Sequence, residues 1–349
     1  MNRTKSEDYK SVLIAFLISV ALLLGSAGLP AQFGMLLLPL AALLLPLLLG
    51  YAVAAGGFAA GSLALILCFV AGSALDYKTS LLLAALSVPF ALTVGYVIRK
   101  QVRFRYSVTA VSGATLVGAA MAVGVLWLLT GEKPVDYVIK GFNSTFSAMD
   151  DAALNAYYQM VRYSDLMTGA VTQAALDAAS RAAAIAFITD QFREMLNVTL
   201  VSLIGAYALL MGLIGYLIPR SALKRRKAQV IPVPPFSEYA LPNRFWLAFI
   251  LSYLFAVIGR SFGWPGFDIL EVTVYALYAL VLTVQGLSFL DYMYKRRNMG
   301  AAVRVALHVL ALVISSLASL VGSLLMWVGL FENMAKLRKR LESKGGAVM

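Results

Sequence analysis

Few residues in this chain could do chemistry, and they do not form a recognised catalytic set. The sequence contains a single cysteine, Cys68, and a single histidine, His308. An internal disulfide and a histidine-rich metal cluster are therefore excluded. No nucleophile elbow, Walker loop, HExxH motif or Cys–His pair is present. We predict no catalytic residue, no metal site and no cofactor, and we expect that the chain is not an enzyme.

Ionisable and aromatic residues near the ends of apolar segments are the candidates for binding a ligand. Arg260 and Glu271 flank a short loop and could form an ion pair across it. The candidate ligand-binding residues are Tyr157, Tyr158, Arg162, Arg260, Trp264 and Glu271. They either line a site beneath an external cap or form an interfacial salt bridge and an aromatic belt at the membrane surface.

Small residues recur at four-residue spacing in two apolar segments. They are Ser11, Ala15 and Ser19 in the first segment and Ala110, Ala114, Gly118 and Ala122 in the fifth. This spacing keeps side chains on roughly one helix face, and small residues let helices approach closely. Each stripe either seats another helix of the same chain or docks a partner protein.

The elements that position these residues are predicted to be membrane-spanning helices. Hydrophobic residues make up 61% of the chain and charged residues 13%, whereas soluble domains carry about 45–50% apolar and about 25% charged residues. A spanning helix needs about 20 mainly apolar residues. The apolar segments are 11–29, 35–53, 58–75, 80–98, 107–130, 195–218, 244–261, 268–290 and 302–331. The predicted fold is an all-α, polytopic transmembrane bundle of 8–10 spans with an extracytoplasmic helical cap.

The basic residues indicate which ends of the segments face the cytoplasm. The net charge of +12 is gathered in short clusters beside apolar segments, which is typical of topology signals rather than of nucleic-acid binding. The clusters at 3–10, 99–105, 220–227 and 295–304 fall on one side if each segment spans once. We therefore expect a multi-pass protein of the plasma membrane with a cytoplasmic N-terminus.

The last apolar segment, 302–331, does not fit this alternation. A fifth basic cluster at 336–344 would fall outside after nine spans. The segment is too long for one upright helix and short for two full spans. We expect a broken or re-entrant pair that returns the tail to the cytoplasm, and the alternative is a single, strongly tilted helix.

Residues 131–193 form the one large region without a spanning segment. Seven acidic and five basic residues make it acidic within a basic chain, as expected for a loop outside the cytoplasm. Alanines recur every fourth residue at Ala170, Ala174, Ala178 and Ala182, which predicts amphipathic helices. We expect one of them to run from about residue 168 into the sixth segment, as a lid, a packed cap or a helix at the interface. The predicted regions are 1–130, 131–193 and 194–349.

Three stretches of the C-terminal half carry a resemblance to a known family. They are Pro-Pro-Phe-Ser-Glu-Tyr-Ala-Leu-Pro at 234–242, Gln-Gly-Leu-Ser at 285–288 followed by 291–297, and Gly-Leu-Phe-Glu-Asn at 329–333 running into 336–340. They resemble the YybS-like (DUF2232) family of bacterial membrane proteins, in which Trp often stands at Tyr239 and Asp near Glu332. The family is more remotely similar to the substrate-binding subunits of energy-coupling-factor transporters and to the rod-shape protein MreD. In those subunits such a stripe, here Ser11, Ala15 and Ser19, seats the coupling subunit.

The resemblance implies no established activity, so two hypotheses remain. The first is a substrate-binding or transport subunit for a small apolar or aromatic molecule, which does not hydrolyse ATP because the chain has no nucleotide motif. The second is a membrane scaffold or regulatory protein, similar in role to MreD. The expected partners are the lipid bilayer, a membrane protein or a second copy of the chain, and a small-molecule ligand, but no nucleic acid.

Overall fold

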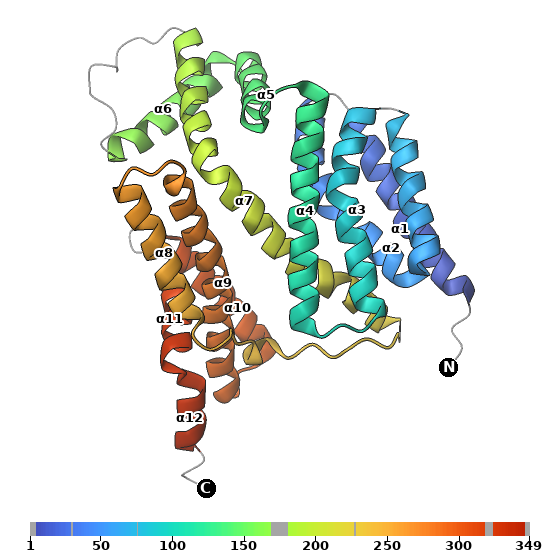
Figure 1. Ribbon diagram of the computed structural model, residues 1–349, viewed down its shortest axis with the longest axis vertical. Coiled ribbons are helices and arrows are strands. Elements are labelled where there is room, and N and C mark those ends of the chain that lie inside the picture. The colour runs from blue at the N-terminus through green and yellow to red at the C-terminus, as the bar shows by residue number, and fades with distance from the viewer. Residues whose placement is uncertain are drawn as a thin grey trace. The chain divides into compact units, whose positions relative to one another are not determined.

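The computed structural model describes residues 5–28, 31–74, 76–168, 181–226, 228–317 and 324–345. Every regular element in these ranges is a helix, which confirms the predicted all-α class (Figure 1). Five of the described helices are long and apolar enough to cross a membrane, and four shorter ones are also apolar. The chain is therefore a multi-pass membrane protein.

Helices α1 (Lys5–Gly28), α2 (Ala31–Ser73), α3 (Tyr77–Arg99) and α4 (Phe104–Thr130) form the N-terminal bundle. Helix α2 contains the second and third predicted segments, and the break between them lies at Gly57, whose backbone is not helical (φ 88°, ψ 172°). A Cβ atom on Gly61 would lie 2.4 Å from the Cα atom of Val53. Residues eight apart in one straight helix cannot approach so closely, so α2 folds back on itself at Gly57.

The core of this bundle is built from the inward-facing apolar residues of the first three helices. Leu23 of α1 is fully buried against Leu45, Leu49 and Val53 of α2 and Ala91 of α3. These side chains cannot hydrogen-bond, so packing rather than polar contacts determines how they are arranged. The outer faces of the same helices carry exposed leucines and isoleucines, as is expected of surfaces covered by lipid.

The predicted cap consists of α5 (Pro134–Ala148), α6 (Asp151–Thr168) and the beginning of α7 (Arg181–Arg225). Phe146, Leu154 and Ile188 are the buried residues of its own small core. Helix α7 continues without interruption from this cap into an apolar stretch. Of the four alanines at four-residue spacing, Ala170, Ala174 and Ala178 lie outside the described residues.

The chain forms two compact units. The first comprises residues 1–200 and 207–230, and the second comprises 201–206 and 231–349. The cap therefore belongs to the same compact unit as α1–α4.

The second unit contains the C-terminal helices and one short 3-10 helix. Its elements are η2 (Phe236–Glu238), α8 (Phe245–Ser261), α9 (Phe267–Arg296), α10 (Ala301–Leu317), α11 (Leu324–Ala335) and α12 (Leu337–Gly345). The last apolar segment is thus divided between two helices, α10 and α11. This is the geometry of a broken pair rather than of a single tilted helix.

Contacts with α9 give the directions of these helices. Arg304 contacts Asp291 at 3.0 Å and His308 lies 3.1 Å from the Leu287 carbonyl oxygen, so α10 runs antiparallel to α9. Glu332 of α11 contacts Gln285, and Arg338, which follows in α12, contacts Ser288 further along α9. Helices α11 and α12 therefore run parallel to α9, and the basic tail lies at the same end of this unit as Lys295, Arg296 and Arg297.

Candidate functional site

Five polar side chains are buried together in the second unit, each with at most 8% of its surface exposed. They are Gln285 and Ser288 of α9, Glu332 and Asn333 of α11, and Arg338 of α12. Burying polar groups is unfavourable unless each is hydrogen-bonded. The group, called here the polar cluster, therefore depends on the contacts described below.

Two glycines bring α9 and α11 close enough for the polar cluster to form. A Cβ atom on Gly286 would lie 2.1 Å from the Leu325 carbonyl oxygen, and one on Gly329 would lie 2.0 Å from the Leu282 carbonyl oxygen. No side chain fits at either distance, so the backbones touch directly at this crossing. Glycine at both positions allows this close helix contact, which small residues also provide in other membrane helices.

Gln285 and Asn333 hold the extended segment that precedes α8. The backbone N–H of Leu241 donates to the Gln285 side-chain oxygen at 2.9 Å, and the Gln285 amide donates to Glu332. Asn333 accepts from the Trp246 N–H and donates to the Pro242 carbonyl, both at 3.1 Å. These backbone groups lie outside or at the end of a helix and need such partners.

Arg338 forms most of the remaining contacts of the polar cluster. Its guanidinium donates at 3.0 Å to the carbonyl oxygens of Ser237 and Tyr239 and to the Ser288 hydroxyl. Its Nε atom lies 3.3 Å from Glu332 as an ion pair. Burial lowers the pKa of Arg338 and the Glu332 carboxylate opposes this shift, but an arginine stays charged in either case.

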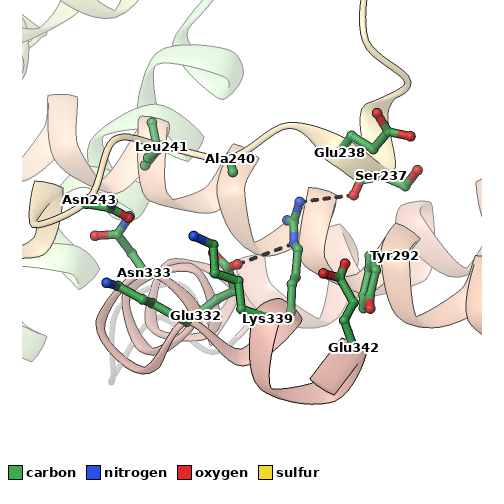
Figure 2. A pocket seen from close by; sticks show the side chains of 12 residues that line it. Ser237, Glu238, Ala240, Leu241, Asn243, Tyr292, Glu332, Asn333, Lys339 and Glu342 are labelled. Atoms are coloured by element: carbon green, nitrogen blue, oxygen red, sulfur yellow. Dashed lines mark hydrogen bonds and ion pairs between the residues drawn. The ribbon is translucent and has the colours of Figure 1, made fainter. Parts of the chain in front are cut away.

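A cavity of about 250 Å³ opens beside the polar cluster. Its charged lining residues are Lys336, Arg338, Lys339, Glu238, Glu332 and Glu342, and Asn243 and Tyr292 contribute neutral polar groups. In Figure 2 the segment that carries Ser237, Glu238 and Asn243 lies on one side, and the helices that carry Glu332, Lys339 and Glu342 lie on the other.

Two lysines of the lining, Lys336 and Lys339, have no ion-pair partner among the described residues. Lys336 joins α11 to α12 in a left-handed conformation, with φ of 52°. The lining as a whole has three basic and three acidic side chains, so its formal charges balance, and the two ammonium groups add hydrogen-bond donors.

The predicted ligand-binding residues of the α8–α9 loop lie next to one another. Arg260 Nη1 donates to Glu271 Oε2 at 2.9 Å, across the loop. The Trp264 ring lies between the rings of Phe262 and Phe267, with centroid distances of 6.0 and 5.2 Å. The loop therefore carries an aromatic cluster beside an ion pair. Loops at a membrane–water interface have the same composition.

The predicted ligand-binding residues of α6 belong to the other compact unit. The Tyr157 ring lies 5.6 Å from that of Phe146, and the Tyr158 ring lies 5.5 Å from that of Phe187. Through these contacts both tyrosine rings pack against other residues of the cap. Arg162 lies within α6, and its side chain is outside the described residues.

The first small-residue stripe packs inside the N-terminal bundle at its two described side chains. Ala15 is buried against Ala52 and Ala64, and the buried Ser19 hydroxyl donates to the Ala15 carbonyl at 2.7 Å. The Ser11 side chain is outside the described residues.

The second stripe is only partly covered. Gly118 is buried, and a Cβ atom there would lie 2.6 Å from the Leu86 carbonyl oxygen. Ala114 and Ala122 are half-buried, and Ala110 is exposed.

The sequence did not single out the polar cluster as a site. Its five members lie in two of the three stretches that carry the family resemblance, 285–288 and 329–340. The signal was therefore present as motifs, but nothing in the linear sequence showed that these motifs meet.

Comparisons with known proteins agree with a membrane protein of unassigned activity. A family model described as "Predicted membrane protein (DUF2232)" matches residues 12–326. No curated protein matches the chain, and no solved structure matches it. The family match covers most of both compact units.

Proposed function

This chain belongs to the family described as "Predicted membrane protein (DUF2232)", and from this premise we propose that it is a substrate-binding or transport subunit without enzymatic activity. The proposal rests on the cavity of about 250 Å³ beside the polar cluster. The charged and polar lining favours a small polar molecule over the small apolar or aromatic molecule that the sequence suggested. The ligand binds through Lys336 and Lys339, and the ring of Tyr292 forms part of the wall.

The rigid surroundings of the cavity support binding. Arg338 and Gln285 fix the segment on one side to the helices on the other, so little order must be gained when a ligand binds. Lys295, Arg296 and Arg297 lie at the same end of the unit, and basic residues favour the cytoplasmic face. We propose that the chain lies in the plasma membrane. The cavity and the N-terminus then both face the cytoplasm.

Native mass spectrometry of the gently solubilised full chain tests this function. A small molecule should remain bound to the wild type and be lost from the Lys336→Gln, Lys339→Gln double variant. Arg340→Gln is the matched control, because Arg340 is exposed on the same helix and does not line the cavity. Equal retention by both variants, or a wild type without any retained molecule, would contradict the proposal.

A scaffold or regulatory role is the second candidate, and one surface favours it. Ala110 of α4 is exposed, and a Cβ atom on Gly113 or Gly124 would meet nothing within 4 Å. Such a face suits close docking of a partner helix. A membrane protein that copurifies with the wild type and is lost with Gly113→Leu, in a preparation without bound small molecule, would favour this role.

A further inference from the structure

We propose that the groove between α9 and α10 binds an anionic phospholipid, with its headgroup at Lys295 and Arg304 and one acyl chain along α10. This cavity of about 540 Å³ is lined by both helices and by Pro235 and Phe236. The proposal does not depend on the function proposed above, because Lys336 and Lys339 do not line this groove.

The headgroup end of the groove is positively charged. Arg304 Nη1 pairs with Asp291 at 3.0 Å, and the buried Arg304 Nε has no hydrogen-bond partner among the described residues. Lys295 is exposed at the same end of the groove. One carboxylate therefore faces two cations, and the surplus charge complements a lipid phosphate.

Apart from Ser237 and His308, the rest of the groove is apolar, and it lies along α10. Val305, Val309 and Leu312 line it and are 63%, 56% and 45% exposed, and Leu287 of α9 forms the opposite wall. Arg304 lies in the first turn of α10, and these apolar residues follow it. A polar end continued by an apolar wall matches the order of a headgroup and an acyl chain, whereas a free anion would use only the first part.

The position of the groove along α9 also fits a lipid. It lies beside the C-terminal end of α9, a helix long and apolar enough to span a membrane. The next residues, Arg296 and Arg297, are exposed and basic. Basic pockets between helices at such a boundary bind anionic headgroups, and each lysine or arginine near the surface contributes about 1 kcal/mol.

The test uses the full chain in detergent, with phosphatidylglycerol and phosphatidylcholine of identical acyl chains as probes and native mass spectrometry as the readout. We expect preferential retention of phosphatidylglycerol, reduced about fivefold by Lys295→Gln. Arg297→Gln is the matched control, because Arg297 is exposed nearby and does not line the groove. Val309→Trp keeps the charge and fills the apolar part, so it should also reduce retention.

Each alternative occupant gives a different result. Equal retention of the two lipids, or equal losses with Lys295→Gln and Arg297→Gln, would overturn the proposal in favour of diffuse surface attraction. Displacement of phosphatidylglycerol by equimolar inorganic phosphate, with no effect of Val309→Trp, would overturn it in favour of an anion site. Loss in both groove variants with Arg297→Gln unchanged would support it.

Discussion

At the scale of single residues, Arg338 holds the part of the segment before α8 that carries Ser237 and Tyr239. One guanidinium satisfies two backbone carbonyl groups and the Ser288 hydroxyl and also pairs with Glu332. The planar fork of arginine provides these several directions at once, which a lysine ammonium cannot reproduce in the same geometry. Arg338 is therefore a structural residue of the candidate site as well as part of its wall.

Removing Arg338 should be costly because it leaves a buried carboxylate without its partner. We expect Arg338→Met to lower the free energy of unfolding by about 3–5 kcal/mol. The double variant Arg338→Met, Glu332→Gln should recover part of this loss, since no unpaired charge remains. Denaturation in detergent, followed by tryptophan fluorescence, measures both effects.

The exposed Arg340 of the same helix provides the control for this cycle. Arg340→Met should change stability by no more than about 0.5 kcal/mol. If the Arg338 and Glu332 substitutions were simply additive, the pair would contribute no coupling energy, and the assignment of a buried ion pair would be wrong.

At the scale of elements, the crossing of α9 and α11 brings the polar cluster together. Gly286 and Gly329 lie at this crossing, and each would place a Cβ atom about 2 Å from a backbone oxygen of the other helix. Contact at this distance leaves no room even for a methyl group. The separation of the two helices, and with it the reach of Gln285 to Glu332, depends on these two glycines.

Gly286→Ala should force the two helices apart and destabilise the unit by about 1–3 kcal/mol, as overpacking does in other cores. Gly300→Ala is the control, because a Cβ atom there meets nothing within 4 Å. The melting temperatures of the purified variants in the same detergent provide the comparison. An unchanged melting temperature for Gly286→Ala would show that the helices do not cross at this distance.

The same elements show what the sequence can and cannot reveal. Long apolar runs predict the helices, and the glycines at 56 and 57 predict the break in α2. Both features depend on residues that are neighbours in the sequence. The pair of Arg260 and Glu271 was expected for the same reason, since only a short loop separates them. Contacts such as Gln285 with Glu332 join residues far apart along the chain, so periodicity gives no register for them.

At the scale of the whole molecule, the number of apolar helices bears on where the two termini lie. The described apolar helices number nine, and α2 folds back at Gly57, so the described residues contain ten apolar helical segments. If each of these segments crosses the membrane once, the even number is expected to return the C-terminal end to the side of the N-terminal end. The number of crossings is also even if α10 and α11 enter the membrane and leave it again on one face. These helices have 17 and 12 residues.

Cysteine labelling tests this topology in spheroplasts with a membrane-impermeant maleimide. A Cys68→Ala background is suitable because Cys68 is the only cysteine. Ser144→Cys in the cap should be labelled in intact spheroplasts, whereas Ser343→Cys in α12 should be labelled only after permeabilisation. The reason is that the basic residues around 336–344 favour the cytoplasmic side, as do those of the other four clusters. Rapid labelling of Ser343→Cys in intact spheroplasts would contradict the broken final pair and require an odd number of crossings.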